Sequence, residues 1–475
     1  MAVISGWLVP HPPLIFPEVG RGKEKKIKAT VAAFREAAEV IAGAAPDTVV
    51  IISPHARTYS DYFQISPGEG ATGDMRSFGV SGVKVEAKFD VDFVRALSLE
   101  CTADGFPAGT LGEDTKGLDH AASIPVRFIN EAAAGNAASD KTTDKVFPKY
   151  VLAGISGLPV ADQYLFGQYI AKTAEALGRK TVVVASGDLS HKLKYEGPYG
   201  YAKEGPAFDR IICEIAKDAD FSRLLLMDGA FLEKAGECGH RPLVVMAGAL
   251  DRKSVESKLY SYEGPFGVGY CVASFTVTGN DDNRDFADRY LDGEKKRAAD
   301  RAENESPHVT LARSTVENYI KTGRLYKEPE PLPEVLKGEK AGVFVCIKKQ
   351  GQLRGCIGTI SPVTDCIGEE IRANAVSAAT RDPRFNAIEE DELPYLEYTV
   401  DVLAPAEPIE SEDELDPERY GVIVSLGAKR GLLLPNLDGI EDVDSQVSIA
   451  LQKAGISEAD RRQVRLERFE VVRYK

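Results

Sequence analysis

The sequence predicts two domains of different class: an N-terminal α/β domain with a central, mostly parallel sheet flanked by helices, and a smaller α+β domain after it. The first prediction depends on a strand–helix–strand unit, in which apolar segments at 3–9 and 48–52 flank an amphipathic helix at 23–44. The second depends on hairpins that are mixed with helices in the last third of the chain.

A change in composition near residue 279 marks the boundary between the two domains. The stretch 279–307 is dense in charged residues, so it is expected to form a polar linker with a solvated helix at 285–303. The expected domains are therefore residues 1–278 and 308–475. A chain of 475 residues is too long for one ordinary domain, which agrees with this division.

Within the first domain, strands and helices are expected to alternate. The segments at 3–9 and 48–52 are expected to be parallel neighbours, and residues 131–147 are expected to form a loop. Further strands are expected at 150–155, 181–185 and 267–277, and further helices at 162–178, 205–218, 221–234 and 243–250.

The second domain is expected to contain helices among short strands. Two hairpins are expected around the turns at 349–352 and 427–430, both of which contain glycine. Helices are expected at 309–322, 362–381 and 444–454, and strands at 342–348, 353–360, 396–403, 422–426, 431–434 and 465–474.

Composition and charge exclude several classes of protein. Hydrophobic residues make up 43% of the chain and charged residues 28%, and no apolar run is long enough to cross a membrane. The net charge of −15 argues against nucleic acid or an anionic membrane as the partner. Scattered cysteines without a CxxC motif, and an N-terminus unlike a signal peptide, predict a cytoplasmic protein without a disulfide framework.

Three histidines follow predicted strands, and they indicate where the chemistry lies. His11 follows the first strand, His55 the second, and His191 the strand that ends in a Ser-Gly-Asp turn. In open α/β sheets the loops after the carboxyl ends of strands bind the ligand, so His11 and His55 are expected to be close in space. His120, beside Asp119, is expected to bind substrate or to support the ligands.

Two histidines and one carboxylate form the usual site of non-haem Fe(II) enzymes. His11, His55 and Glu237 are the candidate ligands, and His191 is the candidate acid/base because the pKa of histidine is near neutrality. Two alternatives stay open: Glu237 can instead interact with the start of the following helix, and Cys238 is a rival ligand as a thiolate. Zn²⁺ or another divalent metal in the same ligand set is a further alternative.

The domain before the linker resembles the LigB-like class III extradiol ring-cleavage dioxygenases. The resemblance is carried by Pro10-His11-Pro12, Ser53-Pro54-His55, Asp119-His120, the segment from Ser186 to His191, and Glu237 ahead of a helix. It implies that His11, His55 and Glu237 bind Fe(II). It also implies that His191 is the acid/base and that His120 lies at the substrate.

Cys238-Gly239, followed by two basic residues, is similar to the related Memo family. In that family a cysteine at this position takes part in metal binding. The sequence therefore carries the dioxygenase-type glutamate and the Memo-type cysteine side by side, and the two resemblances imply different ligand sets.

In the second domain, the motif Arg-Gly-Cys-Ile-Gly at 354–358 places a cysteine between glycines on a predicted strand. Such glycines let a backbone or a ligand approach closely, and Arg354 is a candidate for binding a carboxylate or phosphate. Cys356 is a candidate reactive thiol or, alternatively, a small residue that fills a tight position in the sheet. Arg381 and Arg384 are candidates for the same anion site, and Arg384 alternatively covers the aromatic ring next to it.

This motif is the hallmark of the AMMECR-type family, which the second domain resembles over its whole length. The two halves together resemble the fused proteins of the AmmeMemoRadiSam system, whose name implies a radical S-adenosylmethionine enzyme as partner. The resemblance of the first domain to the extradiol dioxygenases implies an Fe(II)-dependent oxidoreductase that acts on a catechol-like or other small aromatic substrate and associates into homo-oligomers. The alternative is a metal-binding interaction or assembly protein that serves the radical enzyme and has no dioxygenase activity.

Overall fold

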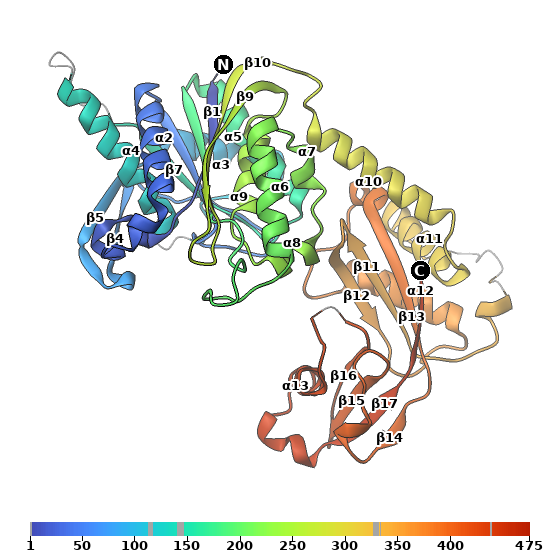
Figure 1. The fold of residues 1–475 in the computed structure, drawn as a ribbon. Coiled ribbons are helices and arrows are strands. Elements are labelled where there is room, and N and C mark those ends of the chain that lie inside the picture. The colour runs from blue at the N-terminus through green and yellow to red at the C-terminus, as the bar shows by residue number, and fades with distance from the viewer. Residues whose placement is uncertain (1, 113–116, 140–146, 326–331, 333, 438) are drawn as a thin grey trace. The chain divides into compact units, whose positions relative to one another are not determined.

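The computed structural model describes residues 2–112, 117–139, 147–325, 332, 334–437 and 439–475. The chain forms two compact units, residues 1–292 and 293–475 (Figure 1). The first unit has a mixed sheet flanked by helices and the second has antiparallel sheets with helices, which confirms the predicted fold classes. Within the described residues, no helix is both long and apolar enough to span a membrane.

A six-stranded sheet forms the centre of the first unit, in the order β7-β2-β8-β1-β10-β9. The first four strands of this order are parallel, whereas β10 and β9 run antiparallel to their neighbours. The strands are β7 (Lys149–Gly154), β2 (Thr48–Ser53), β8 (Thr181–Ser186), β1 (Val3–Val9), β10 (Tyr270–Asn280) and β9 (Lys253–Glu263).

Strand β8 separates β1 from β2, so the prediction that these two strands are direct neighbours was wrong. Both β1 and β2 pair with β8 in parallel register. All residues of β8 are buried, and an apolar strand that is buried on both faces suits the middle of a parallel sheet. The sequence does not reveal this insertion, because β8 lies more than a hundred residues after β2 in the chain. The insertion places the end of β8 between the ends of β1 and β2.

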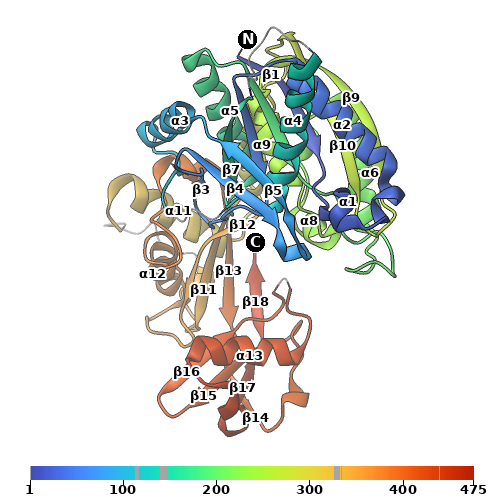
Figure 2. The ribbon, with the colours of Figure 1, turned by 90° about the vertical axis from the view of Figure 1, so that its left-hand side faces the viewer.

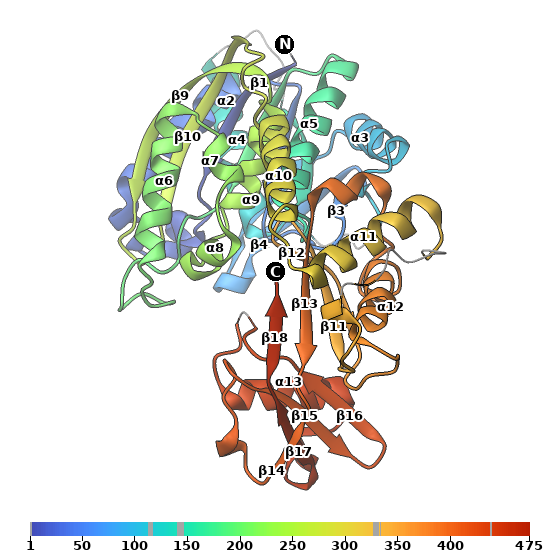
Figure 3. The ribbon, with the colours of Figure 1, turned by 90° about the vertical axis from the view of Figure 1, so that its right-hand side faces the viewer.

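Helices cover both faces of this sheet. Alternate residues of β8 contact different apolar cores, with Val182 and Val184 on one face and Val183 and Ala185 on the other. On the first face lie α2 (Lys28–Gly43) and α4 (His120–Ser139) (Figure 2). On the second face lie α3 (Val91–Ala103), α5 (Val160–Leu177), α6 (Glu204–Asp218) and α9 (His240–Ala249) (Figure 3).

Several local predictions for this unit were wrong. Helix α4 continues to Ser139, where a loop was expected, and the rest of that expected loop, 140–146, lies outside the described residues. The helix expected at 221–234 is two helices, α7 (Ser222–Leu225) and α8 (Gly229–Ala235), because the side chain of Asp228 caps the start of α8. Strand β9 was not expected, and between 56 and 118 the structure adds β3 (Phe63–Gln64), β4 (Gly70–Met75), β5 (Val80–Lys88) and β6 (Ala108–Gly109).

The second unit contains two four-stranded antiparallel sheets. The closing strand expected at 465–474 is divided at Glu470, so that its two halves belong to different sheets. The first sheet, in order, is β12 (Gln352–Gly358), β11 (Val343–Lys349), β13 (Leu396–Leu403) and β18 (Val471–Tyr474). The second is β14 (Glu407–Ile409), β17 (Arg465–Phe469), β15 (Gly421–Leu426) and β16 (Lys429–Leu433).

The first of these sheets is amphipathic. Val343, Val345 and Ile347 alternate along β11 and pack into the core formed with α11 and α12. The residues between them, Cys346 and Lys348 among them, therefore face the opposite side of the sheet. The helices of this unit are α11 (Pro307–Thr322), α12 (Ile367–Thr380) and α13 (Val443–Ala454), and α10 (Phe286–Ala302) contains the boundary between the units.

A disulfide joins Cys346 of β11 to Cys356 of β12, although the scattered cysteines predicted no disulfide framework. The two residues are direct partners in the antiparallel register, and their Cα atoms are 4.1 Å apart. A hairpin brings together residues that are 10 positions apart, which a search for CxxC spacing does not detect. Cys356 is therefore not a free thiol in this structure.

Candidate metal centre

Loops after three parallel strands converge at one edge of the sheet in the first unit. His11 follows β1, His55 follows β2, and the turn that ends at His191 follows β8. The carboxyl ends of parallel strands lie at the same edge of a sheet. Because β8 lies between the other two strands, its turn brings His191 to the two other histidines.

Three histidine side chains lie within reach of one ion. Nε2 of His11 and Nε2 of His55 are 3.2 Å apart, as the strand-end positions predicted. The ring centre of His120 lies 4.6 Å from that of His55 and 5.2 Å from that of His11. One ring nitrogen from each of the three lies within 4.8 Å of the other two. His120, which was expected at the substrate, thus lies where a ligand would lie.

The serine at the end of β8 fixes the proton on His11. The hydroxyl of Ser186 donates to the carbonyl oxygen of Ala121 over 2.7 Å and lies 3.1 Å from Nδ1 of His11. A hydroxyl has one hydrogen, so Nδ1 of His11 must carry the proton and donate it to Ser186. Nε2 of His11 then presents a lone pair to His55, which is the form that binds a metal ion.

Burial keeps these imidazoles neutral. Burial, together with the nearby His55, His120 and His191, lowers the pKa of His11 well below its ordinary value. Burial lowers the pKa of His120 to about 4, and it also lowers the pKa values of His55 and His191. Metal ions bind neutral imidazole, and protons compete with them for the same nitrogen atoms. Because the lowered pKa values weaken proton binding near neutral pH, these histidines are ready to bind a cation.

The spacing of the donor atoms also fits a bound ion. Two nitrogen atoms that bind one ion at about 2.1 Å, at octahedral or tetrahedral angles, lie about 3.0 to 3.4 Å apart. The observed separation between His11 and His55 is 3.2 Å. If Nε2 of His55 is also unprotonated, two lone pairs face each other at this distance, and a cation between them removes their repulsion. The residues present therefore fit a metal ion.

Of the two rival ligands, Cys238 lies beside the histidines, whereas Glu237 is hydrogen-bonded to a helix start. Sγ of Cys238 lies 3.5 Å from Nε2 of His11 and 3.6 Å from Nε2 of His191. The carboxylate of Glu237 instead accepts a hydrogen bond of 2.6 Å from the backbone N–H of His240, at the start of α9. Glu237 thus makes the alternative interaction that the sequence left open, a hydrogen bond with a helix start, and its role as a ligand stays a prediction.

Asp188, Tyr199 and Phe78 border the centre, although the sequence assigned them no role. Asp188 accepts a hydrogen bond of 2.8 Å from the backbone N–H of His11, and burial raises its pKa to about 7. The exposed ring of Tyr199 lies 5.2 Å from that of His191, and the exposed ring of Phe78 lies 5.2 Å from that of His120. Asp188 was detectable in the Ser-Gly-Asp turn, whereas the two loop aromatics follow no pattern.

In the second unit, Arg354 binds a carboxylate of its own domain. Its Nε and Nη2 donate to the two carboxylate oxygens of Glu392 over 3.0 and 2.8 Å. Nη1 and Nη2 also donate to the backbone oxygens of Asn386 and Ala387. The bidentate contact that the sequence predicted is therefore an internal one, and it fixes the loop that precedes β13.

The other candidates of the second unit lie near Cys356 but not in one site. Arg384 pairs with Asp382 at 2.7 Å and donates to the backbone oxygen of Cys356 over 3.3 Å. Its guanidinium also lies 5.4 Å from the ring of Phe385, the aromatic contact offered as an alternative. Arg381 is exposed and does not line the cavity beside Cys356.

Comparisons with known proteins assign both units. Residues 5–273 match the family described as the catalytic LigB subunit of aromatic ring-opening dioxygenase. The chain belongs to the LigB family. Residues 309–474 match the AMMECR1 family, so a LigB unit and an AMMECR1 unit are joined in one chain.

Relatives match either the whole chain or one unit of it. Protein CA_C1420 of Clostridium acetobutylicum is 37% identical over 485 residues and is covered completely, as is this chain. A protein of Thermotoga maritima is 47% identical over 172 residues, which are 36% of this chain and 98% of that protein. The structure of protein PH0010 from Pyrococcus horikoshii shares 32% identity with a TM-score of 0.33, over 35% of this chain and 88% of its own. The structure of protein JW3007 from Escherichia coli K12 shares 14% identity with a TM-score of 0.39, over 57% of this chain and 99% of its own.

Proposed function

We propose that the LigB unit binds one divalent metal ion, with Fe(II) as the expected metal, and catalyses the extradiol-type oxidation of a small aromatic substrate by O₂. The observation that carries the proposal is the group of His11, His55 and His120, whose ring nitrogens gather around one point. The description of the family, an aromatic ring-opening dioxygenase, supports the same class of reaction. Zn²⁺ also accepts nitrogen and sulfur ligands, so the identity of the metal is part of the test.

In this proposal the three histidines hold the ion, and Cys238 is a fourth donor within reach. When bound, Fe(II) supplies the Lewis acidity and the redox chemistry that ring opening by O₂ requires. His191 accepts a proton from a substrate hydroxyl, because burial lowers the pKa of His191 and leaves its imidazole neutral.

Two exposed aromatic rings suit a small aromatic substrate in the same place. Tyr199 lies beside His191, and Phe78 lies beside His120. Aromatic rings orient planar ligands through offset and edge-to-face contacts. We expect the substrate ring to contact Tyr199 or Phe78 while its hydroxyl groups face the histidines.

Metal analysis of protein purified without oxygen tests the first part of the proposal. Wild-type protein is expected to hold iron, whereas His11→Ala and His55→Ala should lose it, because each removes a donor from the centre. His308→Ala is the matched control, since His308 stacks on Tyr474 in the other unit and should leave the metal content unchanged. Iron retained in both variants of the centre would contradict the proposed ligands.

Oxygen uptake tests the second part. The iron-loaded protein is expected to consume one O₂ for each catechol ring that it opens, and His191→Ala should slow turnover while keeping the iron. His120→Ala separates two roles, because loss of iron identifies a ligand and retained iron with a raised KM identifies a substrate contact. Iron-loaded protein that consumes no O₂ with any catechol would contradict the activity.

The position of Cys238 favours a second candidate function. Non-haem Fe(II) oxygenases use a carboxylate beside two histidines, whereas here a thiol approaches the histidines and the neighbouring carboxylate does not. The unit would then hold a metal as an interaction or assembly protein for a radical S-adenosylmethionine enzyme. Copurification of such an enzyme with the chain, together with no O₂ uptake, would favour this function.

A further inference from the structure

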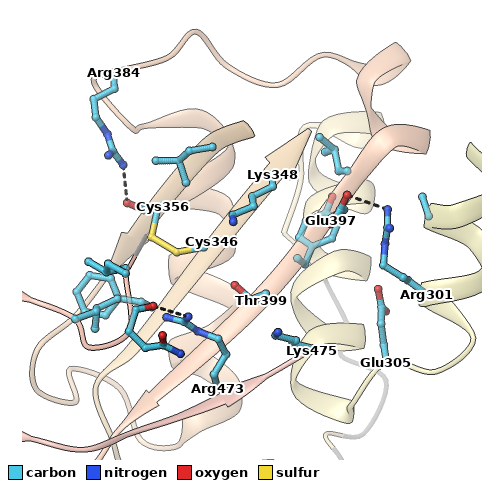
Figure 4. A pocket seen from close by; sticks show the side chains of 18 of the residues that line it. Arg301, Glu305, Cys346, Lys348, Cys356, Arg384, Glu397, Thr399, Arg473 and Lys475 are labelled. Carbon is cyan, nitrogen blue, oxygen red and sulfur yellow. Dashed lines mark hydrogen bonds and ion pairs between the residues drawn. A yellow bond between two sulfur atoms is a disulfide. The ribbon is translucent and has the colours of Figure 1, made fainter. Parts of the chain in front are cut away.

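A cavity of about 1220 Å³ opens in the AMMECR1 unit (Figure 4). One wall is the polar face of the amphipathic sheet, with Cys346 and Lys348 of β11, Cys356 of β12 and Thr399 of β13. Residues of β16 and α13 form another part of the lining. The cavity is therefore bounded by parts of both sheets of this unit, and it has room for a small organic molecule.

The disulfide between Cys346 and Cys356 belongs to this wall. Both cysteines are half-buried, and Figure 4 shows the sulfur–sulfur bond between Arg384 on one side and Lys348 on the other. Val343, Val345 and Ile347 of β11 face the apolar core, whereas Phe344, Cys346 and Lys348 line the cavity, so this side of the hairpin is open to a small molecule. A disulfide that lies in a cavity of this size is accessible to a small thiol.

Positive charge dominates the lining of the cavity. Lysine and arginine side chains outnumber aspartate and glutamate among the lining residues, although arginines such as Arg384 and Arg473 are paired with carboxylates of the same unit. Throughout the part of the chain that the structure describes, no carboxylate lies within ion-pair distance of Lys348 or Lys453. Partial burial and the nearby Arg384 lower the pKa of Lys453, as expected of a cation that has another cation and no anion beside it. An anion in this cavity would remove that repulsion.

We propose that Cys346 and Cys356 form a redox-active disulfide that exchanges with small thiols carrying carboxylate groups, which the cations of the cavity attract. A thiolate is the attacking species in such an exchange, and another thiolate is the leaving group. Nearby cations stabilise thiolates and raise the local concentration of anionic reactants. Lys348 and Arg384 lie on the two sides of the sulfur atoms. Arg384 is paired with Asp382, so Lys348 supplies most of this charge.

The exchange consists of two balanced steps. A small thiolate attacks one protein sulfur, the bond between Cys346 and Cys356 breaks, and a mixed disulfide forms as the other cysteine leaves as a thiolate. A second small thiolate then attacks the mixed disulfide, which releases the remaining cysteine and forms the small-molecule disulfide. Two electrons pass from two thiols to the protein, and the two thiol protons end on the cysteines or in water.

Reduction of the full-length protein by three thiols of different charge tests the proposal. Mercaptosuccinate is anionic, 2-mercaptoethanol is neutral and cysteamine is cationic. Alkylation of the released thiols, followed by mass spectrometry of the peptides with Cys346 and Cys356, measures this pair without interference from the other cysteines. Each rate is divided by the thiolate fraction and by the rate of the same thiol with a neutral small disulfide, which removes differences in intrinsic reactivity.

Mercaptosuccinate is expected to react about tenfold faster than cysteamine at low salt, and this ratio should shrink as salt screens the charges. Lys348→Gln should reduce the ratio several-fold. Lys337→Gln is the control and should leave it unchanged, because Lys337 pairs with Glu334 outside the cavity lining.

Equal normalised rates for the three thiols would overturn the proposal, and so would free thiols at both positions in protein oxidised by air. A preference for mercaptosuccinate that survives in Lys348→Gln and Lys453→Gln together would overturn the role of the cavity cations.

Discussion

Sγ of Cys238 lies 3.5 Å from Nε2 of His11, while the carboxylate of the preceding Glu237 is bonded to the start of α9. Two consecutive side chains therefore point to different parts of the molecule. The backbone N–H of Cys238 donates to the carbonyl oxygen of Asp188, which holds this loop against the turn after β8. Burial is the main cause that raises the pKa of Cys238 well above its ordinary value. A metal ion that binds this sulfur must therefore displace a proton.

Replacement of these two residues should have opposite consequences. Cys238→Ser is expected to weaken metal binding by about tenfold or more, because it removes the donor beside His11. Glu237→Ala should keep the metal and lower the free energy of unfolding by about 1 to 2 kcal/mol, because the start of α9 loses its acceptor. Metal titration against a chelator and urea unfolding followed by the fluorescence of Trp7 measure the two effects. The opposite pattern would make the carboxylate the ligand.

Ser186→Ala is expected to weaken metal binding by about 10- to 100-fold without loss of the fold, because Nδ1 of His11 loses the acceptor that holds its proton. Chelator titration measures the change in affinity. Ser257→Ala is the control, since Ser257 is a half-buried serine of β9 whose hydroxyl donates to the backbone oxygen of Lys217. Affinity that is unchanged in Ser186→Ala would mean that the metal centre does not depend on this tautomer.

The sequence was sufficient for the two fold classes and for the meeting of His11 and His55, because both follow from apolar strands that end in polar turns. It was not sufficient for the order of strands in the sheet. The central position of β8 depends on its packing between helices on both faces of the sheet, with α2 and α4 on one face and α5 and α9 on the other. The approach of His191 to the other histidines follows from that packing and not from spacing.

Other details of the sites were hidden because they depend on side-chain direction or on register. Glu237 and Cys238 are adjacent in sequence, and only the turn before α9 determines which of them faces His11. The pairing of Cys346 with Cys356 depends on the hairpin register, which the turn sets. Arg354 has the donors of an anion site, but its partner is a carboxylate that lies far along the chain.

The ion pair between Arg354 and Glu392 makes the AMMECR1 unit sensitive to acid. Burial opposes the ionisation of Glu392, but the hydrogen bond from Arg354 and the charge of Lys349 outweigh it and lower the pKa of Glu392 to about 2. In the unfolded chain this carboxyl titrates near its ordinary value, about 4.3, so between these pH values the unfolded state binds more protons. Stability from this group is therefore complete above about pH 5 and is lost as the pH falls toward 2.

Glu392→Gln is expected to remove this pH dependence and to lower stability at neutral pH by on the order of 2 kcal/mol. Trp7 lies in the other unit, so the measurement is hydrogen exchange of the amides of β12 and β13 in the full-length protein, at pH 7 and pH 4. The difference between wild type and variant should be large at pH 7 and smaller at pH 4. A difference that does not change with pH would show that Glu392 is not the group that titrates.

Gly355→Ala should destabilise the AMMECR1 unit because β12 lies directly against α12 at this position. A Cβ atom at Gly355 would overlap the backbone carbonyl oxygen of Ala378, and a helix backbone cannot move away as a flexible side chain can. We expect a loss of about 2 kcal/mol or more, seen as hydrogen exchange about 30-fold faster in β12 and α12. Gly338→Ala is the matched control, since a Cβ there would meet no atom within 4 Å. Equal hydrogen-exchange rates in the two variants would mean that β12 and α12 move apart to accept the added methyl group. Close packing would then not explain the glycine before Cys356.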